Sequence, residues 1–402
     1  MERDNTLTLD RVYQAAFALK DVARKTDLIY SRHFSGKNEV YLKTENLQVT
    51  GSFKLRGAYF KISRLSEAEK AAGIVACSAG NHAQGVALAA KRMGIKSTIC
   101  MPDGAPISKV EATKSYGAEI ALVKGAYDDA HTYAGKLVEE TGATLIHPFD
   151  DPDVIAGQGT IGLEILDQLP DVDAIVVPVG GGGLISGVAF AVKQLKPSVK
   201  IYGVQAQEAA SMADSLKQDE QITLSNVSTF ADGIAVKHPG DLTFSLNKEY
   251  VDDVVTVTED EIATAILTLI EKQKLIAEGA GAVSVAAVMF DKIPVEGKKV
   301  VCLVSGGNID VNILSRVITR GLVTSGRNAT LDIGLEDKPG QLVDVANIIA
   351  SCGANVTGVH YSHSDPNTAV TSCVLTLDIE TRDFEQIEAI KRTLAEEGFH
   401  LL

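Results

Sequence analysis

The sequence predicts an α/β protein with two parallel-sheet subdomains, followed by a smaller α+β module. Short apolar segments alternate with helical patterns from residue 73 to 146, and a second series of this kind runs from 155 to 320. Such alternation is typical of parallel sheets covered by helices. From about residue 328 the order becomes strand, helix, strand, strand, helix. That order indicates an antiparallel sheet of the ferredoxin-like type.

The elements of the first series follow from hydrophobic period and turn residues. An amphipathic helix is expected over 9–26, and an apolar strand over 39–42 precedes a helix that begins just after Gly51. Further strands are expected over 73–77, 97–101, 119–123 and 144–146, and helices over 81–93, 109–116 and 126–140. Asn81 is expected to cap the helix over 81–93 and Gly94 to end it.

The second series contains longer apolar strands, as expected of a buried parallel sheet. Strands are expected over 174–179, 200–205, 253–257 and 299–304, and helices over 155–169, 184–195, 262–273, 281–290 and up to about 320. Residues 207–250 are expected to be loop-rich. In the tail, strands are expected over 329–335, 355–363 and 369–378 and helices over 342–351 and 384–397. A fourth strand should be very short or missing. The polar segment 324–328 marks a boundary between residues 1–325 and 326–402.

The composition bounds the possible functions. The chain has 402 residues, enough for two or three domains, and 45% of them are apolar. The net charge of −14 disfavours nucleic acid and anionic membranes as partners, because both attract basic surfaces. The polar amino terminus, and the lack of an apolar stretch of about 20 residues, predict a cytoplasmic protein without a membrane anchor. The five scattered cysteines are expected to be reduced thiols.

Lys54 is the first candidate for chemistry. Gly51 permits a sharp turn and Ser52 is a good N-cap, which places Lys54 in the first turn of a helix. The unpaired N–H groups of that turn disfavour a cation. The pKa of Lys54 is therefore expected to be lowered, leaving a neutral amine for imine chemistry. The alternative is a solvated surface lysine.

Four successive glycines, Gly180 to Gly183, stand between a buried strand and a helix. Their backbone N–H groups and the helix N-terminus suit an anion. The segment is not a dinucleotide fingerprint, because Gln205 ends the next strand where an acidic residue would stand. No lysine follows the glycines, so it is not a P-loop either. The pattern predicts a cradle for a monophosphate, and the alternative is a merely mobile loop.

A reactive lysine and a monophosphate cradle are what pyridoxal 5'-phosphate requires. Ser305 ends a strand before Gly306 and could supply a hydroxyl to the pyridine nitrogen, although it could also be an ordinary turn serine. A hydroxyl would not hold that nitrogen protonated. The electron sink is then weaker, which favours prompt elimination of a β-substituent.

The chain resembles the fold-type II pyridoxal-phosphate lyases, most closely the threonine dehydratases (threonine ammonia-lyases). The matching motifs are GSFKLRGA at 51–58, SAGNHAQG at 78–85, GQGT at 157–160, GGGGL at 180–184 and SGGN at 305–308. They occur in the family's order, and the match covers roughly residues 5–320. The resemblance implies a catalytic domain over 1–325, with the cofactor between two parallel-sheet subdomains. The smaller subdomain, about 52–150, would be inserted in the larger one.

The resemblance also implies how the cofactor is held. Lys54 would carry it as an imine and later move the Cα proton, Phe53 would pack against its ring, and Asn81 would bond its 3'-oxygen. The phosphate and the ring nitrogen would contact Gly180, Gly181, Gly182, Gly183, Leu184 and Ser305.

Other residues take substrate or ion roles by the same resemblance. The substrate carboxylate would be received by Ser78, Gly80, Asn81 and His82, although His82 could equally be structural. Glu278 matches an acidic position near the cofactor, and a helix-cap carboxylate is the alternative. Glu208 and Asp214 are candidate ligands for a monovalent or divalent cation, and the alternative is that both are solvated.

The implied reaction is loss of water from L-threonine to give 2-oxobutanoate and ammonia, in isoleucine biosynthesis or threonine catabolism. L-serine would be a secondary substrate. Ala79 stands where the similar serine racemases carry a second serine as base, so elimination without efficient racemisation is expected. The alternatives are a serine dehydratase, a serine racemase, a β-replacing lyase such as cysteine synthase or threonine synthase, and a catalytically silent amino-acid sensor.

The tail resembles an ACT domain, a small regulatory module that binds amino acids. Its matching feature is the loop DKPGQL at 337–342. The resemblance implies that isoleucine or valine binds there as an effector, and that the chain pairs into a homodimer or homotetramer.

Overall fold

The computed structural model describes residues 6–363 and 371–402. The chain divides into two compact units, residues 1–310 and 311–402. Helix α13 (Val311–Thr324) belongs to the second unit, and the boundary expected at 325/326 lies at the other end of that helix.

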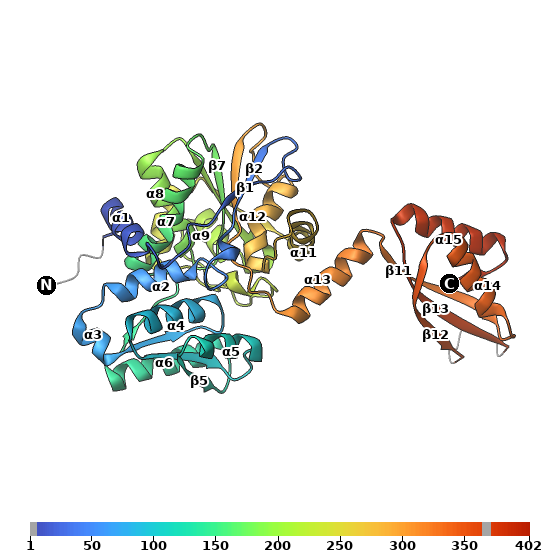
Figure 1. Ribbon diagram of the computed structural model, residues 1–402, viewed down its shortest axis with the longest axis horizontal. Helices are drawn as coiled ribbons and strands as arrows, with labels where there is room; N and C mark the ends of the chain where they lie inside the picture. The colour runs from blue at the N-terminus through green and yellow to red at the C-terminus, as the bar shows by residue number, and fades with distance from the viewer. Residues whose placement is uncertain (1–5, 364–370) are drawn as a thin grey trace. The chain divides into compact units, whose positions relative to one another are not determined.

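The first unit contains a six-stranded sheet of order β1-β2-β10-β7-β8-β9 (Figure 1). Its strands are β1 (Leu28–Tyr30), β2 (Glu39–Lys43), β7 (Ala174–Pro178), β8 (Lys200–Ala206), β9 (Asp253–Val257) and β10 (Lys299–Leu303). All neighbours pair in parallel except β1, an antiparallel edge strand that the sequence patterns did not predict. The helices that accompany this sheet are α1 (Leu9–Ala18), which precedes β1, and α7 (Pro152–Gln168), α8 (Gly183–Leu195), α9 (Ser211–Gln218), α10 (Asp241–Tyr250), α11 (Glu259–Thr268) and α12 (Gly279–Met289), which lie between strands in the chain.

A second, four-stranded parallel sheet lies in the chain between β2 and β7, with the order β5-β4-β3-β6. Its strands are β3 (Ile74–Cys77), β4 (Ser97–Pro102), β5 (Glu119–Val123) and β6 (Thr144–Leu145). The associated helices are α2 (Lys54–Ser63), α3 (Glu67–Ala72), α4 (Asn81–Met93), α5 (Ile107–Ser115) and α6 (Tyr127–Thr141). The chain segment that forms the smaller sheet is thus inserted between two strands of the larger sheet, β2 and β7. The α/β class with two parallel-sheet subdomains is confirmed.

Two local expectations about the elements were wrong. Helix α1 ends at Ala18 instead of residue 26, because the chain turns through Asp21, whose φ of 67° lies in the left-handed region. The end of the segment expected to be loop-rich, 207–250, forms α10, which buries Thr243 and Leu246. The helix expected to end at residue 273 does end there, but its last turn, Leu269–Gln273, is π-helical and is followed by Lys274 with φ 58°.

Helix α2 is positioned by close backbone contact with α7. A Cβ on Gly57 would lie 2.6 Å from the carbonyl oxygen of Val154, and one on Gly157 would lie 2.6 Å from the Cα of Gly57. Only glycine fits at both positions, so the two helices touch through their backbones. Lys54 is the first residue of α2, so its place depends on this contact.

A buried ionic cluster anchors the same helix. The guanidinium of Arg56, 1% exposed, donates to Glu45 at 2.8 and 2.9 Å and to Glu164 at 2.6 Å. The amine of Lys43 donates to the same Glu164 at 2.6 Å. These partners lie around β2 and α7, so α2 is fixed to the larger subdomain although it leads into the smaller one.

The second unit also contains a four-stranded antiparallel sheet, of order β12-β13-β11-β14. Its elements after α13 are β11 (Asn328–Glu336), α14 (Gln341–Ser351), β12 (Asn355–Ser362), β13 (Ser372–Glu380), α15 (Phe384–Glu396) and β14 (His400–Leu401). This β-α-β-β-α-β order is ferredoxin-like, as expected. The fourth strand has two residues, and the expected strand start at residue 369 lies outside the described residues.

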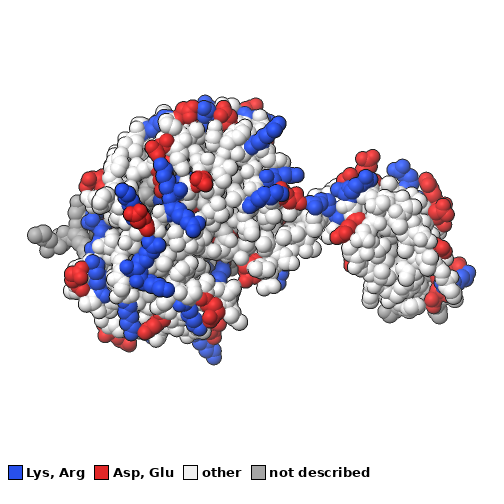
Figure 2. Space-filling view, in the orientation of Figure 1, with Lys and Arg blue, Asp and Glu red and all other residues white. Residues whose placement is uncertain are grey.

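The distribution of charged side chains does not mark out a binding surface on the visible face (Figure 2). Acidic and basic side chains are mixed over the visible face in Figure 2. Among residues 6–363 and 371–402, no helix combines the length and apolar character needed to cross a bilayer.

Candidate active site

The turn before α2 brings Lys54 next to the end of β10. Phe53, not Ser52, is the N-cap of α2, so the predicted N-cap was wrong, whereas the first-turn position of Lys54 is as expected. The backbone of Ser52 instead forms an antiparallel bridge with Gly306, and Phe53 donates its N–H to the carbonyl of Ser305 at 3.1 Å. The Ser52 hydroxyl, fully buried, has no hydrogen-bond partner among the described residues.

The amine of Lys54 is enclosed by neighbouring groups. Its Nζ donates to the carbonyl of Pro148 at 2.8 Å and lies 5.4 Å from the centroid of the Phe53 ring. Burial lowers the pKa of Lys54 from 10.5 to about 8, against the opposing effect of the Glu278 carboxylate. The expected direction is therefore right, but desolvation is the main cause rather than the helix end. With this pKa, roughly a tenth of the amine is unprotonated at pH 7.

A short polar network fixes the Asn81 amide. Asn308 donates from Nδ2 both to the backbone carbonyl of Thr50 and to Asn81 Oδ1, each at 2.8 Å. Because Asn81 Oδ1 is occupied as an acceptor, its Nδ2 faces the other way and donates to Glu278 Oε1 at 2.6 Å. One N–H of Asn81 is used by Glu278, and the amide carries a second one for a ligand.

Glu278 is a buried carboxyl at the start of α12. It is the N-cap residue of that helix, as the helix-cap alternative expected, but its side chain makes no capping hydrogen bond. Its carboxylate accepts from Asn81 instead. Burial, reinforced by Asp232, raises the pKa of Glu278 to about 7, although Asn81 and Lys109 favour the charged form. A Cβ on Gly306 would lie 2.4 Å from Glu278 Oε1, so the glycine makes room for this side chain.

The glycine loop follows β7 and opens α8. Gly182 is the N-cap, with a φ of 96°, and α8 begins at Gly183, one residue before the expected start. A Cβ on Gly181 would lie 2.4 Å from the Phe149 ring, and one on Gly182 would lie 2.7 Å from Met212. Side chains are therefore excluded from these positions on steric grounds, which leaves backbone N–H groups at a helix N-terminus, an arrangement that suits an anion.

The segment from Pro148 to Asp150 joins the lysine to the glycine loop. Pro148 accepts from Lys54, and the ring of the next residue, Phe149, packs against Gly181. Asp150 accepts from the N–H of Thr243 at 3.0 Å, and the hydroxyl of Thr243 donates to the carbonyl of Gly181 at 2.6 Å. The Phe53 ring packs against the core cluster that contains Leu184. The two predicted cofactor elements thus belong to one connected site.

Ser305 lies at the end of β10 and is 2% exposed. Its hydroxyl donates to the carbonyl of Ala280 at 3.4 Å, a long and weak hydrogen bond. The hydroxyl can therefore turn to another partner at little energetic cost.

The residues expected to receive the substrate carboxylate surround the N-terminus of α4. Gly80 is the N-cap and Asn81 the first helical residue, so the predicted cap was displaced by one position. The Ser78 hydroxyl accepts from the N–H of Gly80 at 3.2 Å. His82 is buried, and its Nε2 lies 2.8 Å from the carbonyl of Ile146. Burial, with Lys54 nearby, lowers the pKa of His82 to about 3, so its ring is neutral. These contacts favour the structural role for His82.

The structure does not group the candidate cation ligands with other possible metal ligands among the residues that it describes. Glu208 is exposed in the 3-10 turn Gln207–Ala209, and Asp214 is half-buried in α9. Among the described residues, three possible metal ligands lie close together in the second unit: Asp337, His363 and Cys373. Neither Glu208 nor Asp214 belongs to this group.

Several site residues were not predicted: Pro148, Phe149, Asp150 and Asn308. A signal for them existed in the sequence, because His147-Pro148 and Ser305-Gly306-Gly307-Asn308 each follow a strand. The carboxyl ends of parallel strands are where ligands bind in α/β sheets.

These residues fit pyridoxal 5'-phosphate. They include a buried lysine amine of lowered pKa, a glycine loop at a helix N-terminus that tolerates no side chain, and a loosely bonded serine hydroxyl. The Asn81 amide, oriented by Asn308, adds an N–H donor. This donor set matches an aldehyde, a phosphate, a pyridine nitrogen and a ring oxygen.

Comparison with known proteins gives the same answer. The family model described as pyridoxal-phosphate dependent enzyme matches residues 19–306. The L-threonine ammonia-lyase of Thermotoga maritima is 51% identical over 98% of this chain and 99% of its own, and the catabolic L-threonine dehydratase TdcB of Escherichia coli K12 is 46% identical over 78% and 97%. Among solved structures, the processed form of threonine deaminase isoform 2 from Solanum lycopersicum has a TM-score of 0.73 at 42% identity, covering 77% of this chain and 88% of that one. Maize serine racemase has a TM-score of 0.74 at 36% identity, covering 79% and 98%. The chain therefore belongs to the family of pyridoxal-phosphate dependent enzymes.

Proposed function

We propose that this chain is an L-threonine ammonia-lyase, which converts L-threonine to 2-oxobutanoate and ammonia and uses L-serine as a secondary substrate. The observation that carries the proposal is the 51% identity to an L-threonine ammonia-lyase over nearly the full length of both chains. The site described above supplies the groups that the reaction needs.

The bound cofactor supplies an electron sink that acidifies the Cα–H of an amino acid joined to it. Lys54 would be its covalent anchor, the backbone of Gly180 to Leu184 would hold its phosphate, and Ser305 would face its ring nitrogen. The support for these roles is the chain of contacts through Pro148 and Phe149 that connects the lysine with the loop.

Lys54 is the residue suited to move the substrate proton. A general base works best when its pKa lies near the working pH, and the pKa of Lys54 is lowered to about 8. Its Nζ donates a hydrogen bond to a neutral acceptor, the backbone carbonyl of Pro148. A released amine can therefore take a proton at Nζ without first breaking an ion pair.

Asn81 and Glu278 form a hydrogen-bonded pair in the polar part of the site. The Asn81 amide is oriented by Asn308, and one of its N–H groups is bonded to Glu278. The other N–H would bond the cofactor ring oxygen. Glu278 has a pKa of about 7 and can hold or give up a proton beside that amide. The N-terminus of α4 would bind the substrate carboxylate with Ser78 and Gly80.

Ala79 bears on the outcome of the reaction. Its methyl group offers no proton on the face opposite the lysine, whereas a serine hydroxyl there could return one to Cα. Elimination without efficient racemisation follows, and this separates the proposed activity from that of the similar serine racemases.

The test combines an assay with covalent trapping. Purified holoenzyme should form 2-oxoacid from L-threonine faster than from L-serine, and borohydride reduction followed by peptide mapping should label Lys54. Lys54→Ala should remove both signals, while Lys70→Ala, a change at an exposed pair with Glu67, should remove neither. The proposal would be overturned if borohydride labelled a different lysine. It would also be overturned if the enzyme acted on O-acetylserine plus sulfide instead of L-threonine, as a β-replacing lyase does.

We also propose that the second unit binds isoleucine or valine and that the chain forms a homodimer or homotetramer. Support comes from the ferredoxin-like sheet of this unit and from exposed Val343 and Val359, a surface that pairing would cover. Initial rates with L-threonine should change when either amino acid is added, and light scattering should give the mass of two or four chains. An unchanged rate curve would rule out the effector.

A further inference from the structure

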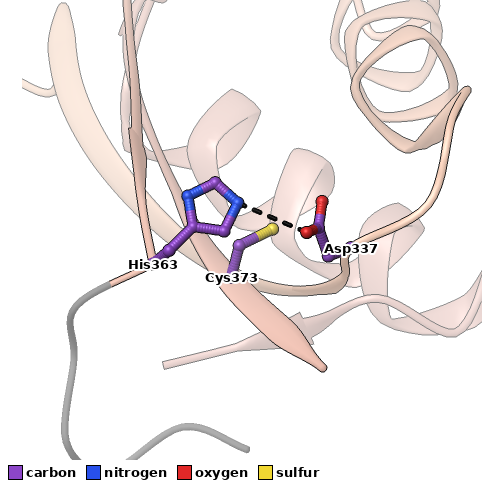
Figure 3. A group of neighbouring side chains, drawn as sticks. All are labelled: Asp337, His363 and Cys373. Atoms are coloured by element: carbon purple, nitrogen blue, oxygen red, sulfur yellow. Dashed lines mark ion pairs between the residues drawn. The ribbon is translucent and has the colours of Figure 1, made fainter. Parts of the chain in front are cut away.

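We propose that Asp337, His363 and Cys373 in the second unit bind a divalent transition-metal cation, with Zn²⁺ as the fitting ion. The three ligand atoms, a carboxylate oxygen, an imidazole nitrogen and a thiol sulfur, all lie within 4.8 Å of one another. Figure 3 shows the sulfur pointing toward the space between the imidazole and the carboxylate. The site lies outside the proposed catalytic machinery and belongs to a different compact unit.

Strand register brings the three residues together. Leu335 of β11 pairs with Cys373 of β13, and Asp337 stands two residues further along, on the same face of the sheet. Ser362 of β12 pairs with Val374, so His363 is opposite Cys373 and shares its face. Asp337 donates its N–H to the carbonyl of Thr371 at 3.0 Å, which continues the ladder past the end of β11. The grouping therefore follows from three adjacent strands rather than from chance contact of mobile side chains.

The distance between the imidazole and the carboxylate suits a shared metal ion better than a direct hydrogen bond. His363 Nε2 and Asp337 Oδ2 are 3.6 Å apart, too far for a hydrogen bond between them. Two such ligands on a tetrahedral zinc ion are separated by roughly 3.4 Å, given Zn–N and Zn–O bonds of about 2.1 Å. The Tyr361 ring stacks on the imidazole, with centroids 6.1 Å apart, and this contact limits its rotation.

The donor set selects the ion. Thiolate and imidazole ligands favour zinc-like cations, whereas magnesium and calcium require oxygen ligands. A thiolate and a carboxylate together neutralise a 2+ ion. The Asp337 and His363 side chains are 60% and 57% exposed, so a cation can enter from solvent, while the buried Cys373 closes the inner side. Three protein ligands leave one coordination position for water or a small anion.

Binding would tie three strand ends together at the start of the loop between β11 and α14. When the ion enters, the Cys373 thiol loses its proton to solvent and Sγ bonds the metal, with no change of oxidation state. The inference does not depend on the proposed threonine chemistry, because the test measures metal binding directly.

The experiment uses the full-length holoenzyme freed of metal by chelation and titrated with Zn²⁺ by calorimetry. One ion per chain should bind, and His363→Ala and Cys373→Ser should each weaken binding by at least about 100-fold. The matched controls are His360→Ala, an exposed histidine of the same strand, and Cys352→Ser, a thiol of the same unit; both should bind like the parent.

A spectroscopic measurement separates ligand loss from misfolding. Co²⁺ added to the parent protein should give a sulfur-to-cobalt charge-transfer band that is absent in Cys373→Ser and retained in Cys352→Ser. Failure of the parent to bind Zn²⁺, equal affinity in His363→Ala, or a cobalt complex without the sulfur band would each overturn the proposal.

Discussion

Replacing Glu278 by glutamine should stabilise the cofactor-free protein at alkaline pH. The buried carboxyl has its pKa raised from 4.5 to about 7, chiefly by burial. The native state therefore binds this proton more tightly than the unfolded state does. The associated stability is fully present below pH 4.5 and is lost as the pH rises through 7.

The gap between 4.5 and about 7 corresponds to about 3 kcal/mol, at 1.36 kcal/mol for each pH unit. Glutamine has nearly the same shape and cannot ionise, and its amide oxygen can still accept from Asn81. The unfolding free energy of Glu278→Gln relative to the parent should therefore grow by about 3 kcal/mol between pH 4.5 and pH 8.

Urea unfolding followed by circular dichroism at several pH values measures this difference. Glu220→Gln, a change at an exposed carboxylate, serves as the matched control and should show no such growth. A difference between Glu278→Gln and the parent that stays constant over this pH range would refute the reasoning, because it would mean that the buried carboxyl is not penalised when charged.

Three further substitutions test other parts of the first unit. Gly181→Ala would place a methyl group 2.4 Å from the Phe149 ring, and cofactor affinity, measured by spectral titration, should fall about tenfold or more; unchanged affinity would contradict the steric argument. Ala79→Ser should produce D-serine from L-serine, detected by chiral chromatography, and no gain would count against the role given to this position. Glu45→Gln takes one of two carboxylates from the buried Arg56 and should lower the unfolding free energy by about 3 kcal/mol in urea, whereas a loss below about 1 kcal/mol would show that Glu164 suffices.

The sequence predicted the elements that depend on local pattern. The strand–turn–helix rhythm gave both parallel sheets, and the four glycines gave a loop between a buried strand and a helix, as observed at Gly180 to Gly183. It also placed Lys54 in the first turn of its helix. These features are set by residues close together in the chain, so a single sequence contains them.

What the sequence could not supply depends on distant partners. Serine is a favoured N-cap residue, but the backbone of Ser52 pairs with Gly306. With that bridge in place, the helix begins one residue later and Phe53 is the N-cap. Glu278 meets Asn81, which is 197 residues away along the chain. The cause of the lysine's lowered pKa, enclosure rather than the helix end, also required the packed structure. No local period records these long-range contacts.

The segment from Pro148 to Asp150 has a practical consequence for redesign. It is a single run of chain that contacts both the Lys54 amine and the glycine loop. An engineer who wants this scaffold to accept a longer coenzyme analogue should vary the length of that run and leave both end points untouched. Conversely, a library that randomises residues 148–150 will disturb the contacts with Lys54 and with the glycine loop at the same time. The effect of a variant on one of these contacts could then not be separated from its effect on the other.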